Sequence, residues 1–552
     1  MIPNLAAADF WVIAAYFVLT FGVGVFALRR RHETKEDYFL SGRSLPWHLA
    51  GLSMVATTFA ADTPLAVTGI TIERGIAGNF LWLSLIPSGI LTAIFYARLW
   101  RRSGVMTDAE FATLRYSGKP ARFLRRFRAL YLAVPVNLII MGWVTTGMAK
   151  VMQVLFQFPT WQTLGMLYAF TVLYIVLSGL WGVVITDVLQ FLIAITACIE
   201  LAVIATGHAG GLDQLWQNAE KTLRPGATEI YPWYYAGPVY VVVVWLGAQW
   251  WASWYPGFEP GGGGYVAQRL LSTRNENHAV AAALLFNVLH FVVRPWPWII
   301  TALAAAVALP QGTDKELLYP QAILAWMPSG LKGLMVAAFL AAFMSTIATH
   351  LNWGASYILN DVFAGTRFAP QTQRGEMLLS RITIIFLAVA AVGVSFLMDS
   401  VSAGWELILS ISAGTGPVYL LRWYWKRINA LSEISAMAGA FLFSLLLAGF
   451  DLPQEIRLCL VALFTSIFWV AVTLVTRPEG TEKLAAFEKL VSPRRWTLRE
   501  LVVFVAAVAV IYSAFFLIGE LLRKNWYAVS LNALGLAVAL AVTYAALRRR
   551  VN

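Results

Sequence analysis

Long apolar runs recur along the chain from residue 8 to residue 548, separated by short polar segments. A transmembrane helix needs about 20 mainly apolar residues, and by this measure the pattern predicts about fifteen crossings. The predicted spans are 8–29, 46–74, 79–101, 128–156, 160–180, 181–206, 237–258, 278–309, 330–361, 376–398, 402–422, 431–450, 456–476, 499–522 and 527–548. No long polar block lies between them, so we expect one all-α integral membrane domain over residues 1–552.

The composition favours the same class, because 59% of the residues are hydrophobic and 13% are charged. A soluble fold would leave much of that apolar surface in water. The net charge of +12 is concentrated in short loops after spans one, three, seven, nine, eleven, thirteen and fifteen. Because basic loops stay in the cytoplasm, we expect a cell-membrane protein with its N-terminus outside and its C-terminus inside. The charge therefore indicates orientation rather than a nucleic-acid partner.

The second span, 46–74, is interrupted at its centre by Thr57, Thr58, Asp62, Thr63 and Pro64. Proline removes a backbone donor, and a carboxylate near the bilayer centre costs several kcal/mol unless it is paired or hydrated. Irregular backbone at this depth persists inside protein or beside a wet cavity, where it holds ions and polar solutes. The break therefore predicts a transport site. The alternative is a proline-kinked helix in which the aspartate has a structural partner.

A second break is predicted at 237–264, where Gln249, Pro260 and the four glycines at 261–264 oppose a continuous helix. This span is the seventh, five spans after the first broken one. An odd offset makes the second unit enter the membrane from the opposite side. The count therefore predicts two inverted five-helix repeats whose broken helices meet at the midplane.

Oxygen-bearing side chains in two other spans could serve a cation. Ser345 and Thr346 lie on a small-residue face of span nine, and such hydroxyls either bind a hard cation or bond back to the carbonyls of Ala341 and Ala342. Asp187 lies near the expected cytoplasmic end of span six. It could attract a departing cation, cap the helix or pair with a cytoplasmic arginine.

Arg294 lies far along span eight from the cytoplasmic start of that span. Because a helix rises roughly 1.5 Å per residue, the side chain is too deep in the membrane to reach water easily. His290 is one turn earlier, and Asp62 or Glu406 are candidate partners. One interpretation is a structural pair between Arg294 and Asp62. In the other, Arg294, with Gln249, holds an anionic group of the solute through its planar fork of donors.

Several segments resemble the sodium/solute symporter family, which includes the sodium/proline and sodium/glucose symporters. They are WGVVITDVLQ, GLMVAAFLAAFMST, YVAQRLLSTRNENHA and LRWYWKRINA, and the likeness covers about residues 8–450. The resemblance implies a leucine-transporter-type core of two inverted five-helix repeats. The corresponding parts are an extra N-terminal helix at 8–29, repeats at 46–206 and 237–422, and additional helices at 431–548.

The resemblance also implies site residues. By position, sodium would be held by the backbone oxygens of Ala56, Phe59 and Ala342 and by the hydroxyls of Ser345 and Thr346, with Asp187 on the exit path. The expected substrate contacts are Asp62, Thr63, Gln249, His290 and Arg294. The segment PGFEPGGGG has no counterpart in the better-known members, so sugar or proline specificity does not carry over.

We therefore expect a sodium-coupled symporter that imports a small polar organic solute by alternating access. Alternatives are a proton-coupled or uncoupled transporter and, from a different class, an intramembrane transferase. A transferase needs a nucleophile, an acid/base pair or a metal cluster, and the six histidines show no ligand spacing. We expect no enzyme activity, no metal beyond sodium as coupling ion and no obligatory protein partner; the partners are the solute and the lipid bilayer.

Overall fold

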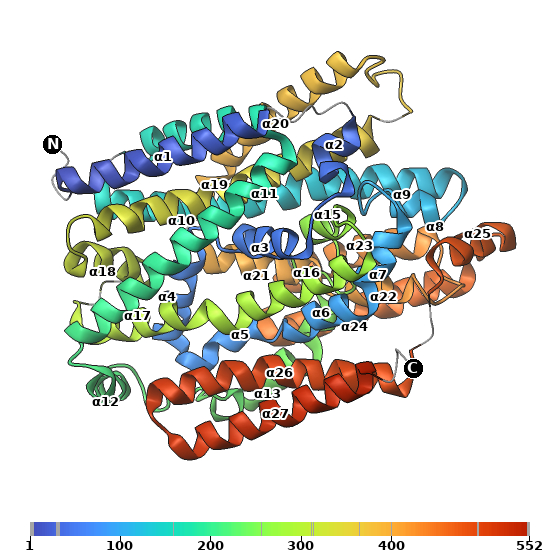
Figure 1. Cartoon of the computed structure of the whole chain (residues 1–552). Helices are drawn as coiled ribbons and strands as arrows, with labels where there is room; N and C mark the ends of the chain where they lie inside the picture. Colours follow the sequence, from blue (N-terminus) through green and yellow to red (C-terminus); the bar gives the residue numbers. More distant parts are fainter. Residues whose placement is uncertain are drawn as a thin grey trace.

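The computed structural model describes residues 5–28, 34–157, 159–254, 257–310, 312, 314–363, 365–398, 400–493 and 496–548. The basic residues 29–31 after the first span lie outside this part of the chain. The described residues form helices and one isolated bridge between Leu45 and Thr273, and no named strand. Most helices run side by side in one bundle (Figure 1), with the two termini at opposite ends. The predicted all-α class is confirmed.

The helices of the described residues follow the apolar runs closely. They are α1 (Ala7–Leu28), α2 (Lys35–Leu40), α3 (Trp47–Thr58), α4 (Thr63–Arg74), α5 (Phe80–Leu83), α6 (Ile86–Leu91), α7 (Ala97–Ser103), α8 (Phe111–Arg115), α9 (Gly118–Tyr131), α10 (Asn137–Phe156), α11 (Thr160–His208), α12 (Leu212–Thr222), α13 (Val239–Val244), α14 (Trp250–Ala252), α15 (Gly264–Leu271), α16 (Glu276–Val288), α17 (Pro295–Ala308), α18 (Leu318–Trp326), α19 (Leu331–Tyr357), α20 (Gln373–Ser395), α21 (Val401–Ile411), α22 (Gly416–Leu421), α23 (Ala430–Ala448), α24 (Gln454–Val475), α25 (Thr481–Val491), α26 (Leu498–Arg523) and α27 (Trp526–Arg548). Single π-helical turns join α6 to α7, α9 to α10 and α16 to α17.

The number of crossings differs from the prediction. Within the described residues, ten helices are long and apolar enough to span a membrane, or up to eleven if the bent pair α3–α4 counts as one span. The predicted count of fifteen is not confirmed. Four shorter apolar helices coincide with predicted spans one, five, seven and eleven, at Ala7–Val23, Leu164–Leu173, Val239–Ala252 and Val401–Ile411.

The boundary predicted between spans five and six, at residue 180, is not marked by a break. The backbone is helical from Thr160 to His208, a stretch of 49 residues. At about 1.5 Å per residue this exceeds twice the roughly 30 Å of a bilayer core. The part that meets the length and hydropathy requirements of a crossing is Leu180–His208. This crossing begins at the boundary that hydrophobicity predicted, so span six is confirmed.

The first predicted break is confirmed. Helix α3 ends at Thr58, α4 begins at Thr63, and their axes differ by 59°. Pro64 lies in the first turn of α4, where its missing N–H has no helical partner to lose. Gly147 of α10 passes so close to the break that a Cβ atom there would lie 2.6 Å from Asp62 Cα. The glycine therefore lets α10 support the irregular backbone directly.

The second predicted break is also confirmed. The helical segment that starts with α13 ends at Ala252, and α15 begins only at Gly264. In between, Gly257 and Gly261 have φ angles of +85° and +83°, in the left-handed region that glycine adopts without a Cβ clash. Residues 255 and 256 lie outside the described part of the chain. The two broken segments meet where Arg269 of α15 donates to Ser53 of α3.

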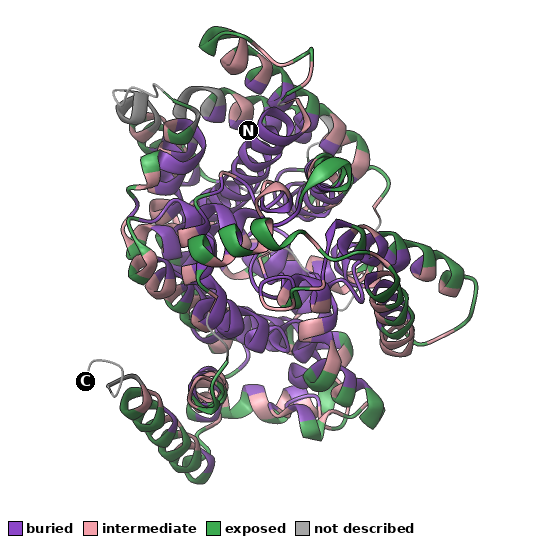
Figure 2. Cartoon of the chain, turned by 90° about the vertical axis from the view of Figure 1, so that its right-hand side faces the viewer, coloured by how far each residue is buried: buried purple, intermediate pink, exposed green. Residues whose placement is uncertain are grey.

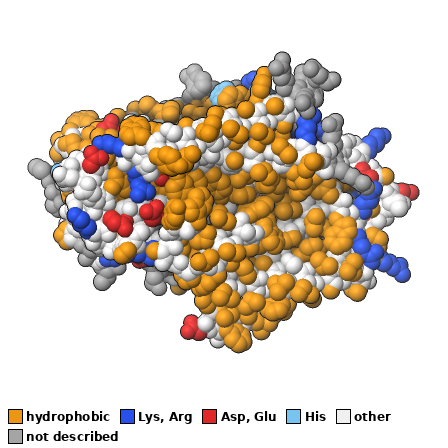
Figure 3. All heavy atoms as spheres, turned by 90° about the horizontal axis from the view of Figure 1, so that it is seen from below, with side chains coloured by type: hydrophobic (Ala, Val, Ile, Leu, Met, Phe, Trp, Pro, Cys, Tyr) orange, Lys and Arg blue, Asp and Glu red, His pale blue; other side chains and the backbone are white. Residues whose placement is uncertain are grey.

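Burial follows the expected arrangement of a membrane protein. The central helices are mostly buried, and the outer ones expose much of their surface (Figure 2). One face carries a broad belt of hydrophobic side chains, with charged side chains gathered at its two ends (Figure 3). In helix α19 the residues from Met335 to Tyr357 are all buried. The predicted ion and solute sites are built around this helix and the first break.

Candidate functional site

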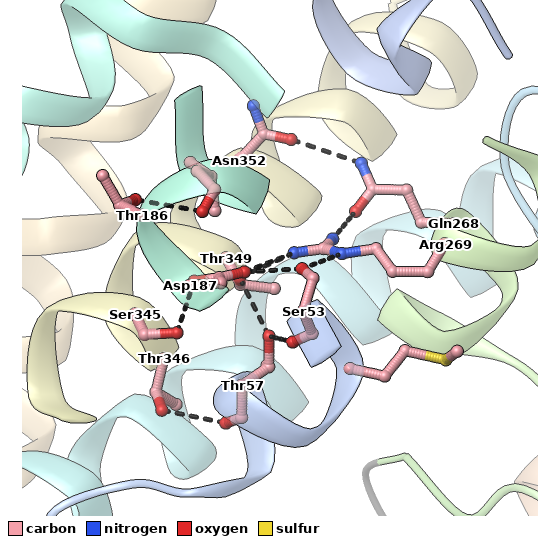
Figure 4. A network of polar contacts seen from close by, with 12 residues as sticks. Ser53, Thr57, Thr186, Asp187, Gln268, Arg269, Ser345, Thr346, Thr349 and Asn352 are labelled. Atoms are coloured by element: carbon pink, nitrogen blue, oxygen red, sulfur yellow. Dashed lines mark hydrogen bonds and ion pairs between the residues drawn. The ribbon is translucent and has the colours of Figure 1, made fainter. Parts of the chain in front are cut away.

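The predicted sodium ligands of α19 lie directly against the end of α3. Thr346 Oγ1 donates to the backbone oxygen of Thr57 at 2.8 Å and to that of Ala342 at 3.0 Å. The bond to Ala342 is the back-bond that the sequence left open as an alternative. The bond to Thr57 crosses between helices and joins α19 to the last turn of α3, where carbonyls lose their helical partners. Oxygen atoms from two helices therefore converge at this point (Figure 4).

Ser345 makes a different contact from the one expected. Its hydroxyl donates to Asp187 Oδ1 at 2.5 Å, and Ser53 Oγ donates to Asp187 Oδ2 at the same distance. Asp187 of α11 is fully buried. Its carboxylate lies beside Ser345, a predicted sodium ligand. The carboxylate was expected farther along an exit path. The structure instead brings it into hydrogen-bond contact with Ser345, a predicted sodium ligand.

Asp187 also has a counter-charge, as one of the sequence alternatives held. Arg269 Nη2 lies 3.8 Å from Asp187 Oδ2, and both side chains are buried. The guanidinium donates further to Thr349 Oγ1 at 2.9 Å and to Gln268 Oε1 at 2.7 Å. Figure 4 shows these groups as one connected network beside Ser345. Buried charges persist when they are paired and hydrogen-bonded in this way.

A cavity of about 60 Å³ lies next to the first break. Four predicted substrate residues line it, namely Asp62, Thr63, His290 and Arg294. Thr346 lines it as well, so one predicted sodium ligand also belongs to the cavity wall. The wall also contains aromatic side chains that the sequence reasoning missed: Trp82, Trp143, Phe258, Tyr265 and Trp405. They come from five separate segments, and no spacing along the chain marks them.

Arg294 forms hydrogen bonds with neutral groups beside the first break. It donates to Thr58 Oγ1 at 3.0 Å and to the Val55 carbonyl at 3.5 Å, and its Nη2 lies 3.2 Å from His290 Nε2. Since an arginine only donates, His290 Nε2 must accept, which assigns the ring proton to Nδ1. That Nδ1 lies 3.0 Å from Thr58 Oγ1. The histidine is therefore a neutral support for the arginine.

Two sequence expectations about Arg294 need correction. Glu406, a candidate partner, pairs with Arg74 at 3.3 Å. Gln249 does not line the cavity, because its amide donates to the Leu81 carbonyl at 2.5 Å and to Ser84 Oγ at 3.1 Å. The remaining candidate, Asp62, attracts Arg294 electrostatically across the cavity. The sequence placed all of these groups at similar depth but could not give the direction of each side chain.

The described residues contain no group of three or more His, Cys, Asp or Glu placed to hold a metal ion. The two cysteines, Cys198 and Cys459, are free thiols. The oxygen-rich ion site and the polar cavity can bind and release small species without covalent chemistry.

Two broken helices that meet beside a buried polar cavity, within a bundle of apolar helices, define a multi-pass membrane transporter of small solutes. Residues 38–442 match the model of the sodium:solute symporter family, which is more than half of the chain. The chain belongs to this family. It is a sodium-coupled symporter of a small solute, with sodium as the coupling ion, and the family and its relatives are transporters, not enzymes.

Individual relatives agree with this assignment. The chain is 25% identical over 508 residues to a sodium/glucose cotransporter of Vibrio parahaemolyticus, covering 86% of this chain and 90% of the relative. It is 25% identical over 559 residues to the sodium/myo-inositol cotransporter of Mus musculus, covering 87% and 75%. Because these identities are low, the solutes named here are those of the relatives and are not assigned to this chain.

Solved structures show the fold. A Na⁺-coupled sialic acid symporter in a substrate-bound outward-open state superposes with a TM-score of 0.70 at 18% identity, covering 86% of this chain and 99% of that one. A nucleobase-cation-symport-1 family transporter gives 0.50 at 11% identity, covering 82% and 97%. The predicted leucine-transporter-type fold is confirmed.

Proposed function

We propose that this symporter imports a small polar organic solute together with sodium, and that both bind at the first broken helix. The observation that carries the proposal is the position of Thr346. Its hydroxyl bonds to the Thr57 carbonyl in the ion site, and the same residue lines the cavity. An ion that orders this junction also orders the wall of the solute site, which couples the two ligands through shared contacts.

The proposed sodium ligands are the carbonyl oxygens of Ala56, Phe59 and Ala342 and the hydroxyls of Ser345 and Thr346. The set consists of hard oxygen donors, as a small monovalent cation requires. In the described conformation the Ala56 carbonyl accepts from Phe59 N at 3.1 Å, so the last turn of α3 keeps its own hydrogen bonds. Sodium would replace the contact between Thr346 and Thr57 with direct coordination.

We further propose that Asp187 draws sodium toward the cytoplasm. Its carboxylate contacts Ser345 on one side and Arg269 on the other, so it links the ion site to the α15 segment. A cation that leaves Ser345 meets a negative group at once. The arginine limits how tightly the carboxylate can hold it, which favours release over trapping.

The proposed solute contacts are Asp62, Thr63, His290 and Arg294, with Gln249 reassigned to supporting the second broken segment. The orientation is proposed from the charge pattern: Lys and Arg side chains are prominent at the end of the belt where the C-terminus lies (Figures 1 and 3), and this end is the cytoplasmic one. Termini at opposite ends of the bundle support an odd number of crossings.

The test is a thermal-stability screen of detergent-purified protein against a metabolite panel, in sodium and in potassium at equal ionic strength. A ligand that binds the folded state raises Tm. The proposal expects at least one solute whose stabilisation depends on sodium, followed by uptake into proteoliposomes driven by an inward sodium gradient. Uptake that follows a proton gradient and ignores sodium would overturn it.

A further inference from the structure

A carboxylate oxygen in the cavity wall has no hydrogen-bond donor. Asp62 is buried, its carboxyl group interacts with Trp405, and its Oδ1 atom accepts no hydrogen bond from any described residue. Leaving a buried polar atom unsatisfied costs about 1–3 kcal/mol, and more when the group is charged. The wall of the cavity therefore contains a buried carboxylate whose hydrogen-bonding capacity is incompletely satisfied.

The surroundings of Asp62 favour a positively charged group. The cavity is lined by Trp82, Trp143, Phe258, Tyr265 and Trp405. Aromatic faces attract ammonium and quaternary ammonium groups, and they do so more strongly where water is excluded. A carboxylate combined with several aromatic walls is thus the recognition chemistry of a cationic nitrogen.

A simple cation would nevertheless meet Arg294 in the same cavity. This guanidinium is buried and is held in place by Thr58 and His290, which are neutral. A simple anion would meet Asp62 in turn. Asp62 and Arg294 attract each other, and a singly charged solute that binds one of them weakens its interaction with the other, which is costly inside the membrane. A solute with both charges compensates both.

We propose that the transported solute is a small zwitterion, with its ammonium or quaternary ammonium group at Asp62 and the aromatic walls and its carboxylate at Arg294. This inference rests on the proposed function and specifies its substrate class. Arginine binds carboxylates through two parallel donors, which fixes the orientation of the solute. The neutral histidine adds no competing charge.

The size of the cavity agrees with a small solute. A volume of about 60 Å³ has room for about five water-sized groups at roughly 10–15 Å³ each. The smallest amino acids have a comparable number of heavy atoms. A hexose or a cyclitol is larger and offers hydroxyls to Asp62 and Arg294 without compensating either charge.

The experiment uses the full-length protein in detergent and measures Tm in sodium and in potassium. The probes are the twenty proteinogenic amino acids, glycine betaine and proline betaine, with glucose and myo-inositol as neutral polyols. Each zwitterion that raises Tm is compared with its decarboxylated amine and its deaminated acid. We expect a sodium-dependent rise with a zwitterion and at least tenfold weaker binding of both singly charged analogues. A polyol or a singly charged analogue that binds equally well, or no response to any zwitterion, overturns the inference.

Two variants test which residue binds which charged group of the solute. Asp62→Asn should weaken zwitterion binding at least tenfold, to an affinity close to that of the deaminated acid. Arg294→Gln should lower the zwitterion affinity to a value close to that of the decarboxylated amine. Glu406→Gln is the matched control, because Glu406 pairs with Arg74 outside the cavity wall. The rise of Tm caused by sodium alone reports folding and ion binding. If sodium still stabilises the protein but no zwitterion does, this inference fails and the proposed function stands. If a zwitterion binds equally well without sodium, this inference stands and the proposed sodium coupling fails.

Discussion

The hydroxyl of Ser345 donates a 2.5 Å hydrogen bond to Asp187 Oδ1, so a proposed sodium ligand is polarised by a buried carboxylate. A serine oxygen can donate its proton and still offer lone pairs to a cation. Donation to a negative group makes that oxygen a better ligand, since charge-assisted hydrogen bonds are short and strong. Asp187 thereby influences the ion before it leaves as well as during its exit.

Replacing Asp187 by asparagine should separate these two effects. The amide can still accept from Ser345, but it no longer attracts the cation or compensates Arg269. We expect slower sodium-driven uptake with near-normal solute binding at saturating sodium, and lower stability because a buried pair that loses one partner costs about 3–5 kcal/mol. Uptake rate and equilibrium binding measured on the same preparation check this. Asp361→Asn, which removes a buried carboxylate that pairs with Arg125 at 2.6 Å, controls for loss of a buried ion pair. Loss of solute binding in the Asp187 variant would place this residue within the solute site.

The double variant Ser345→Ala, Thr346→Ala should abolish sodium stimulation, because it removes both hydroxyl ligands. Sodium-dependent stabilisation should fall at least tenfold in apparent affinity, while Thr346→Ser should retain it. Ser356→Ala is the control on the same helix, because the Ser356 hydroxyl bonds back to the Trp353 carbonyl. An unchanged sodium dependence in the folded double variant would exclude this ion site.

Gly147→Ala tests the close approach of α10 to the first break. In an open helix this change is favourable by about 0.8–1.0 kcal/mol, but here the new Cβ would lie 2.6 Å from Asp62 Cα. We therefore expect lower stability and reduced uptake. Gly165→Ala in α11 has no atom within 4 Å of the new Cβ and should be neutral or stabilising. Equal effects at the two glycines, read from thermal unfolding, would remove Gly147 from its positioning role.

Gln249→Leu distinguishes a supporting role from a solute contact. The variant loses the bonds to the Leu81 carbonyl and Ser84, so stability should drop by about 1–3 kcal/mol for the acceptors left unsatisfied. The solute dissociation constant should change less than threefold, because this side chain lies outside the cavity wall. A tenfold weaker solute affinity without loss of stability would restore Gln249 as a direct contact.

Arg294→Lys keeps the charge and removes the planar fork. If Arg294 binds the carboxylate of the solute, affinity should fall at least tenfold while sodium still raises Tm. Calorimetric titration of both proteins with the same zwitterion gives the two constants. Equal constants would mean that the arginine only supports Thr58 and His290.

Much of this account could be predicted from the sequence. Asp62 and Pro64 within an apolar run predicted the first break, because neither suits a continuous lipid-facing helix, and the glycines at 261–264 predicted the second. Family resemblance supplied Ser345 and Thr346. These signals are local in the chain, so residue type and spacing are sufficient to find them.

Other features depend on tertiary packing and left no such signal. The aromatic wall gathers side chains from five segments, and Arg269 reaches Asp187 from a helix about 80 positions away in sequence. Gln249 occupies the expected segment but points toward Leu81. Hydrophobicity placed the start of the second crossing of α11 at residue 181, and the structure places it at Leu180. The resemblance supplied the proposed ligands and Asp187, but not the hydrogen bond between Ser345 and Asp187.

The central claim is that sodium and solute are coupled through the junction of α3 and α19. The most direct test is the dissociation constant of the best zwitterion, measured calorimetrically in saturating sodium and in potassium at equal ionic strength, for the wild type and for Thr346→Ala. The account predicts at least tenfold tighter binding in sodium for the wild type, a matching gain in sodium affinity when the solute is present, and loss of both in the variant. Equal solute affinity in sodium and potassium for the wild type would contradict it.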